Sequence, residues 1–345
     1  MSNLPDDSRG SVRPFNCRPA EPPEIHWALR MLLGSATTLA SGDQVMDFVS
    51  YAQQRAMNLA DTWIAERHGE MVGAILPIVS PGRTMLLLCS PMKIGDRAAG
   101  ALIDAVCEHF VPRGIKLAQV LLEPGEPPTE ALFTAHQFRR IAELIYLQGT
   151  VKRAQYPAVP KDMSWSVYSP QTHADFATTI VVSYRQSLDC PGLNGVRDIE
   201  DVLAGHKSSG KFDPRYWFLL RERGQGIGAI LVSRLPLTDS AELVYLGLAP
   251  EARRRGLAAL MMQQALAATV QMGASRLSLA VDSQNVPALK LYYRFGLAKA
   301  ASKIAMMREL GERSQESGAR SQELGREPAE SEGAQSPRPH SSPGA

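Results

Sequence analysis

The segment from Leu246 to Ala259 combines residue types that suit the binding of a phosphate group. A predicted strand ends at Leu248, a short loop carries the run Arg253 to Arg255, and Gly256 precedes a long segment rich in Ala, Leu and Met. The first amides of a helix have no partners within it, and the helix dipole adds partial positive charge there, so phosphate binds readily. A glycine lets the backbone approach the phosphate, and arginines can hold a further one. Taken alone, the arginine run is also typical of a solvated helix start or of a nucleic-acid contact.

Two further residues could move protons near such a loop. Tyr292 lies in a predicted short helix, and Glu242 lies near the start of the strand that ends at Leu248. A tyrosine hydroxyl can donate a proton and a carboxylate can accept one, provided both face the same cleft. Tyr292 could instead be a core residue of its helix, and a strand glutamate such as Glu242 often faces solvent.

Two spaced motifs carry a resemblance to a known family. The pattern Arg253-x-x-Gly256-x-Ala258 resembles the Q/R-x-x-G-x-G/A signature of the GNAT superfamily of N-acetyltransferases, which cradles the pyrophosphate of acetyl-CoA. The pattern Asn285-x-x-Ala288-x-x-Leu291-Tyr292-x-x-x-Gly296-Leu297 looks like the N-x-x-A-x-x-L-Y-x-x-x-G-F block of the same superfamily. The resemblance covers residues 163–310, with a weaker copy at 13–150, and this tandem layout is similar to that of mycothiol synthases.

The resemblance implies a reaction and a set of site residues. An amine would attack the thioester of acetyl-CoA directly, backbone amides near Leu248 would polarise its carbonyl, Tyr292 would protonate the departing thiolate, and Glu242 is the candidate base. A thiol has a pKa of about 8.5 and a tyrosine one of about 10, so Tyr292 donates only in a concerted step or with a lowered pKa. The residues implied to bind acetyl-CoA are Leu246, Gly247, Leu248, Arg253, Arg254, Arg255, Gly256, Leu257, Ala258, Ala259 and Asn285.

The acceptor is less well defined by the sequence. The turn-rich loop from Asp189 to Gly195 follows the first predicted helix of the second copy, and in this fold that region borders the acceptor. Asp189 and Asn194 are therefore candidate substrate contacts. Cys190 is a weak candidate nucleophile, because the family forms no covalent intermediate and no histidine partner is evident. A small amine, an amino sugar, or a peptide or protein amine all remain open as acceptors.

A long internal repeat must position these residues. Shifting the sequence by 159 residues aligns Pro91 with Pro250 and Gly114 with Gly273 without a gap. A self-similar period of this length predicts two copies of one domain. In the second copy we expect strands at 165–169, 217–222, 227–234, 241–248, 276–281 and around 306–307, with helices at 172–188, 198–206, 255–272 and 287–295. The fold class is therefore α/β or α+β, as two tandem GNAT-type domains with mixed central sheets.

The first copy departs from the pattern at the decisive positions. Arg97 stands in place of Gly256, Ile94 in place of Arg253, Glu126 in place of Asn285, Phe133 in place of Tyr292, Gln137 in place of Gly296, and Arg83 in place of Glu242. We therefore expect the first copy to lack catalysis and to serve a structural role or to form a wall of the acceptor pocket.

Composition limits the remaining alternatives. The 345 residues carry a net charge of only +2, which argues against a protein that mainly coats nucleic acid. No apolar run approaches the roughly 20 residues of a membrane span, and no secretory signal is visible. The four cysteines and seven histidines are scattered, so we expect free thiols, no metal site and a cytoplasmic protein.

The expected organisation is a flexible 1–12, a degenerate domain at 13–150, a linker at 151–162, an active domain at 163–310 and a disordered tail at 311–345. The leading hypothesis is an acetyl-CoA-dependent N-acetyltransferase. The alternative is a catalytically silent acetyl-CoA sensor or scaffold of the same fold.

Overall fold

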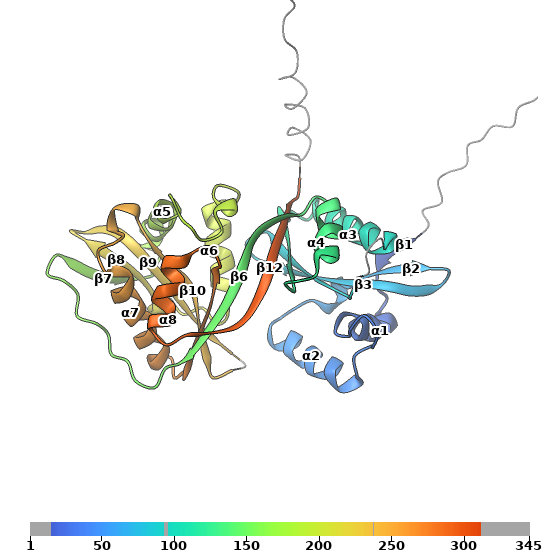
Figure 1. Cartoon of the computed structure of the whole chain (residues 1–345), viewed down its shortest axis with the longest axis horizontal. Coiled ribbons are helices and arrows are strands. Elements are labelled where there is room, and N and C mark those ends of the chain that lie inside the picture. Colours follow the sequence, from blue (N-terminus) through green and yellow to red (C-terminus); the bar gives the residue numbers. More distant parts are fainter. Residues whose placement is uncertain (1–14, 93–95, 237, 312–345) are drawn as a thin grey trace, which may run out of the picture. The chain divides into compact units, whose positions relative to one another are not determined.

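One order of helices and strands occurs twice in the computed structural model, which describes residues 15–92, 96–236 and 238–311 (Figure 1). The first copy contains β1 (Asn16–Pro19), α1 (Pro22–Leu32), α2 (Gly42–Gln54), β2 (Trp63–Arg67), β3 (Glu70–Ser80), β4 (Thr84–Cys89), α3 (Arg97–Phe110), β5 (Leu117–Leu122), α4 (Pro127–Ala135) and β6 (Arg139–Thr150). The second contains β7 (Met163–Val167), α5 (His173–Ser183), α6 (Ile199–Ser208), β8 (Trp217–Glu222), β9 (Gln225–Leu235), β10 (Ser240–Leu248), α7 (Leu257–Gln271), β11 (Arg276–Asp282), α8 (Val286–Arg294) and β12 (Ala298–Glu309). The elements α8 and β12 begin and end 159 residues after α4 and β6, so the predicted repeat is confirmed.

The last strands of the two copies are exchanged between their sheets. Strand β6 of the first copy pairs with β11 of the second, with Thr150 opposite Arg276 at one end and Leu144 opposite Asp282 at the other. Strand β12 of the second copy pairs with β5 of the first, and β6 and β12 also pair with each other (Figure 1). The strand order is β1-β2-β3-β4-β5-β12-β6-β11-β10-β9-β8-β7 in one sheet of 12 strands. The strands of both copies therefore form one continuous mixed sheet, and the predicted mixed α/β class is confirmed.

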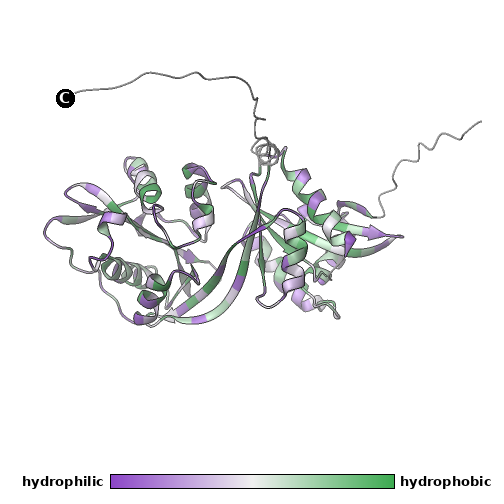
Figure 2. Cartoon of the chain, turned by 45° about the horizontal axis from the view of Figure 1, so that its top comes forward, coloured by the Kyte–Doolittle hydropathy of each residue, from purple (hydrophilic) through white to green (hydrophobic). Residues whose placement is uncertain are grey.

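Helices cover both faces of each half of this sheet. In the second half, one apolar cluster joins α7 to one face, and another, centred on Phe176 and Trp217, joins α5 and α6 to the opposite face. The first half is built in the same way, with α3 on one face and α1 and α2 on the other. The strands beneath the helices are mainly apolar (Figure 2). Burial of both faces explains why these strands read as nearly continuous apolar runs.

Strands β10 and β11 pair only briefly before they diverge. Their parallel pairing runs from Ser240 to Glu242 on β10, opposite Arg276 to Ser278 on β11. Strand β10 remains paired with β9 as far as Leu248. Beyond Glu242, the edge of β10 that faces β11 therefore presents its backbone groups to a cleft.

Two of the differences between predicted and observed helix ends have a clear cause. The helix expected to run to Leu188 ends at Ser183, because the guanidinium of Arg253 takes the backbone carbonyls at and after that point. Helix α7 begins at Leu257, two residues later than expected, because Arg254 and Gly256 have positive φ values of 59° and 78°.

The remaining predictions concern the final strand, the two ends of the chain and the domain boundaries. The final strand, expected around 306–307, extends over all of β12. The segment 1–12, expected to be flexible, and all of the tail expected to be disordered at 311–345 except Gly311 lie outside the described residues. The boundaries at 13–150, 151–162 and 163–310 stay predictions.

The strand exchange predicts how the chain behaves when it is cut. A protease site inserted between Pro157 and Pro160 should give two fragments that elute together on size exclusion, because β6 stays bound between β11 and β12. Urea should then separate the fragments. Fragments that separate in plain buffer would contradict the exchange, and the uncut protein is the control.

Candidate active site

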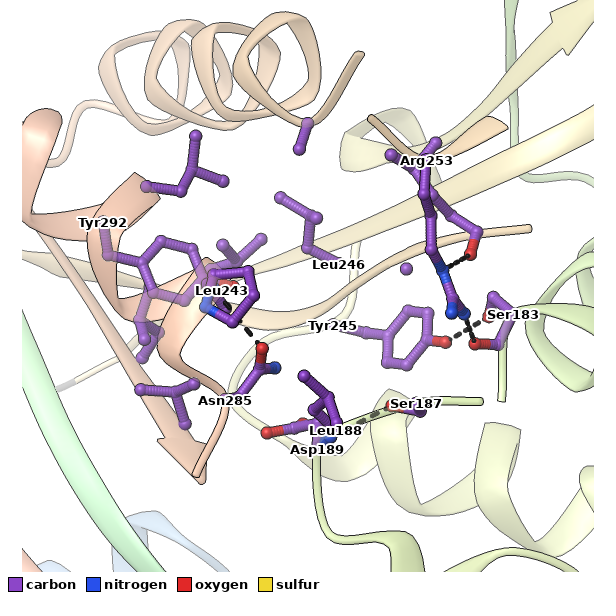
Figure 3. A pocket seen from close by; sticks show the side chains of 18 of the residues that line it. Ser183, Ser187, Leu188, Asp189, Leu243, Tyr245, Leu246, Arg253, Asn285 and Tyr292 are labelled. Atoms are coloured by element: carbon purple, nitrogen blue, oxygen red, sulfur yellow. Dashed lines mark hydrogen bonds between the residues drawn. The ribbon is translucent and has the colours of Figure 1, made fainter. Parts of the chain in front are cut away.

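A cavity of about 550 Å³ opens where β10 and β11 diverge. Its other walls are the start of α7, one side of α8, and the segment from Ser183 to Asp189 that follows α5. Figure 3 shows Tyr292 and Arg253 at opposite ends of this cavity, with Asn285 and Asp189 on the wall between them. The structure thus gathers residues from five segments of the second copy around one space.

Free backbone amides lie at the start of α7. Within the described residues, the five N–H groups from Arg254 to Ala258 donate no hydrogen bond to the protein, whereas the N–H of Ala259 already bonds to the carbonyl of Gly256. Gly256 has a φ of 78°, and no atom lies within 4 Å of the position that a Cβ would take there. Because unpaired amides at a helix start attract anions, this end of the cavity is suited to a phosphate group.

The three arginines of this loop have different roles. The guanidinium of Arg253 donates hydrogen bonds to four backbone carbonyls. These belong to Ser183 and Arg185, both at 2.8 Å, to Gln186 at 3.0 Å and to Leu248 at 3.1 Å. Arg253 therefore ties the segment after α5 to the end of β10. Its side chain has little capacity left for a phosphate.

Arg254 and Arg294 are the arginines of this region that remain available to a ligand. Arg255 forms a bidentate pair with Glu222, at 2.6 and 3.0 Å. Arg254 lines the cavity, and its side chain has no hydrogen bond or ion pair to any described residue. The same holds for Arg294, which sequence reasoning missed. Its signal was a basic residue in the last turn of α8.

Tyr292 projects from α8 into the cavity and is only 7% exposed. Burial raises the pKa of its hydroxyl, and the nearby carboxylate of Asp189 raises it further. The hydroxyl therefore keeps its proton at neutral pH and can donate a hydrogen bond. A complete proton transfer to a thiolate is uphill unless the transfer coincides with cleavage of the C–S bond.

The remaining residues implied to bind acetyl-CoA shape the walls. Asn285 caps α8, where its side-chain oxygen accepts the N–H of Ala288 at 3.3 Å. A Cβ at Gly247 would lie 2.3 Å from the hydroxyl of Tyr245, which bonds to Ser183 at 2.5 Å. The cavity is also lined by Leu246, Leu248, Ala258 and Ala259, whereas Leu257 is buried in the core behind it.

Glu242 lies apart from Tyr292. It is in the last pair before β10 and β11 diverge, and it lines a second cavity of about 290 Å³ together with Tyr146, Ser278 and Lys303. Burial raises the pKa of its carboxyl. The structure therefore does not bring the candidate acid and the candidate base together in one cavity.

The two candidate acceptor residues also separate. Asp189 lines the main cavity, whereas Asn194 is not among the lining residues and donates from its side chain to the carbonyl of Tyr184 at 3.3 Å. Burial raises the pKa of Cys190 to about 12, so its thiol is poorly suited to act as a nucleophile.

The corresponding region of the first copy is filled by side chains. Phe133, which replaces Tyr292, is fully buried and packs edge-on against Phe138. A Cβ at Gly100, which aligns with Ala259, would lie 2.2 Å from the ring of His136. That ring is held by Asp104 at 2.8 Å, and Asp104 is held by Arg308 of the exchanged strand β12.

Arg83, which aligns with Glu242, makes a contact between the two copies. Its Nε donates to the carboxylate of Asp201 on α6 at 2.8 Å. Arg197, which precedes α6, donates to the carbonyls of Gly82 and Asp201. The turn between β3 and β4 therefore packs on α6 of the second copy.

The described residues contain no group of three or more His, Cys, Asp or Glu side chains placed to hold a metal ion. No helix among them has the length and apolar character to cross a bilayer.

Comparison with known proteins identifies a family for part of the chain. Residues 187–297 match the family model described as the acetyltransferase (GNAT) family, and this range contains both the β10–α7 loop and α8. The second copy therefore contains a GNAT-type domain, and the same order of elements occurs in the first copy. A search of curated proteins found no match to this chain.

Solved structures with similar folds belong to the same superfamily. A GCN5-related N-acetyltransferase from Sphaerobacter thermophilus is 15% identical with a TM-score of 0.57, over 86% of this chain and 96% of that one. A glucosamine N-acetyltransferase region of a fungal multi-domain GH3 beta-N-acetylglucosaminidase is 16% identical with a TM-score of 0.55, over 89% of this chain and 39% of that one. A tandem GNAT protein from the clavulanic acid biosynthesis pathway is 18% identical with a TM-score of 0.49, over 86% of this chain and 99% of that one. At such identities the likeness shows the fold alone.

The contacts of Arg253 predict a loss of stability on its removal. Arg253→Ala should lower the free energy of unfolding by about 2 kcal/mol or more, because it leaves several carbonyls without their charged donor. Chemical denaturation measures the change. Arg255→Ala, which removes only an exposed pair with Glu222, is the matched control and should behave as wild type. Equal effects of the two changes would contradict the role assigned to Arg253.

Proposed function

We propose that this protein transfers the acetyl group of acetyl-CoA to a primary amine, and that the second copy of the fold does so. The observation that carries the proposal is the row of free amides from Arg254 to Ala258, which opens into the cavity beside Arg254 and Arg294. Pyrophosphate would bind these amides and the two guanidinium groups. The apolar walls made by Leu279, Ala288 and Leu291 would hold the pantetheine arm.

The reactive end of the cofactor would then reach the region of Tyr292. The hydroxyl of Tyr292 would donate to the thioester sulfur and protonate it as the C–S bond breaks. The free edge of β10 beyond Glu242 would supply backbone N–H groups to the thioester carbonyl, in the manner of an oxyanion hole. Glu242 could act as base only through water, because it lines a different cavity.

We propose further that the first copy does not catalyse. Phe133 provides no proton, and the ring of His136 fills the space beside Gly100 that corresponds to the cofactor cavity. Its role would be to supply β6 to the sheet and to hold α6 through Arg83. The acceptor would be a small amine, an amino sugar, or a peptide or protein amine. The thiols of Cys89, Cys107 and Cys190 form no disulfide within the described residues, which suits the cytoplasm.

Binding of acetyl-CoA tests the carrying observation. Calorimetry should find one site, and Gly256→Glu should abolish it, because a side chain there enters the space before the amides and a residue with a Cβ is strained at a φ of 78°. Arg97→Glu, which introduces the same side chain at the aligned exposed position of the first copy, is the control and should bind as wild type. Two sites, or binding that survives Gly256→Glu, would contradict the assignment.

Loss of the Tyr292 hydroxyl tests the chemistry. Tyr292→Phe should lower the rate of thiol release from acetyl-CoA by about 100-fold, the lower range for a general acid, and should leave the affinity for acetyl-CoA unchanged. A thiol-reactive dye measures the rate. If the wild-type protein binds acetyl-CoA but turns over no amine, the chain is a sensor and not an enzyme.

A further inference from the structure

Asp189 is the carboxylate that shares the main cavity with Tyr292. It follows the segment that Arg253 ties down, and it stands in the wall between Tyr292 and Arg253 (Figure 3). Its Oδ1 accepts the backbone N–H of Asp282, the last residue of β11, at 3.0 Å. In return, the carboxylate of Asp282 accepts the N–H of Cys190 at 3.1 Å. This reciprocal pair fixes the position of the Asp189 carboxyl against the end of β11.

The surroundings of Asp189 favour uptake of a proton. The residue is exposed to solvent at the cavity, but the protein atoms packed around its carboxyl raise the pKa by desolvation. The negative charge of Asp282 adds to this, while the bonds from the Asp282 amide and the Asn285 side chain oppose it. Burial raises the pKa of the cavity tyrosines Tyr184, Tyr245 and Tyr292, and the charge of Asp189 adds to this in each case. The carboxylate therefore acts on phenols from three different parts of the cavity wall.

We propose that Asp189 binds the ammonium group of the acceptor and takes its proton before the attack on the thioester. The proposal rests on the acetyl-transfer function proposed above, and it assigns the base to the cavity of Tyr292 instead of to Glu242. The acceptor class that follows is a primary amine that is cationic at neutral pH. An uncharged amine would gain nothing from the carboxylate.

The proposed step balances as follows. The ammonium gives one proton to Asp189, and the nitrogen lone pair forms a C–N bond at the thioester carbonyl. The C–S bond then breaks, and its electron pair and the proton of Tyr292 go to sulfur. The new amide nitrogen loses its second proton, which restores Tyr292 through solvent, and Asp189 releases its proton to water. The sum is one acetyl-CoA and one ammonium to one amide, one CoA thiol and one proton.

A structural lock is the competing explanation, because Asp189 also holds the N–H of Asp282. Asp189→Asn separates the two roles. The carboxamide oxygen can still accept that N–H, and the side chain keeps its size, so only the charge and the basicity are lost. Melting temperature and affinity for acetyl-CoA should therefore stay at wild-type values. Asp175→Asn on α5, where the carboxylate pairs with Arg221 away from the main cavity, is the matched control.

The measurement is thiol release from acetyl-CoA, first with ethylamine as the probe amine and then with water alone. The second assay is included because slow hydrolysis of acetyl-CoA needs the same base. Asp189→Asn should lower both rates by about 100-fold, and Asp175→Asn should not change them. In the wild type the rate should fall with decreasing pH, because protonation of Asp189 removes the base. This fall should occur at a higher pH than the protonation of an ordinary aspartate, because the pKa of Asp189 is raised. The variant should lack this limb.

Three results would overturn the proposal. Asp189→Asn with wild-type rates, or with a loss of melting temperature that accounts for its loss of rate, leaves a structural lock. Loss of rate in Glu242→Gln with none in Asp189→Asn returns the base to Glu242. If the wild type binds acetyl-CoA but releases no thiol with ethylamine or water, the acetyl-transfer function itself fails and the proposal falls with it.

Discussion

The divergence of β10 and β11 is the constraint on which the rest of the second copy depends. Parallel strands that separate after Glu242 leave backbone groups without partners and apolar side chains without cover. A cleft of this kind stays open only if other segments hold its rims. Helix α8 holds one rim, since Asn285 caps its start and the side of α8 that bears Tyr292 packs into the core. The start of α7 and the segment from Ser183 to Asp189 hold the other rim.

Arg253 decides where that second rim lies. Its guanidinium joins the carbonyls after α5 to the end of β10, so the wall that carries Asp189 is fixed to the strand that would present the thioester. Asp282 fixes the same wall to β11. Polar contacts to backbone thus tie the segment to both of the diverging strands, and they help to fix the width of the cavity on this side.

Much of this could be predicted from the sequence, and the part that could not has a common cause. The repeat is visible when the sequence is aligned with itself, and the loop with Gly256 and the helix with Tyr292 are local patterns. The structure places this loop and this helix around one cavity, as their spacing suggests. The hydrogen bonds from Arg253 to the carbonyls after α5 join residues nearly seventy positions apart in the sequence. No local pattern predicts such bonds, so the position of Arg253 in its motif suggested a phosphate ligand instead. Glu242 and Tyr292 line different cavities because of the way in which neighbouring elements pack around β10, and the sequence of β10 does not show that packing. The ring of His136 beside Gly100 and the exchange of β6 and β12 are long-range contacts that no local pattern encodes.

The exchange of strands has a consequence for synthesis of the chain on the ribosome. The first copy emerges complete in sequence by Thr150, but the strand that pairs with β5 is β12, whose last residue is Glu309. Until then β5 has an open edge, because the backbone groups that pair with β12 from Leu117 to Leu122 have no partner strand. The nascent first copy must therefore wait, partly folded, for nearly the whole of the second copy to be made. Its β6 meanwhile offers a template on which β11 and then β12 can assemble.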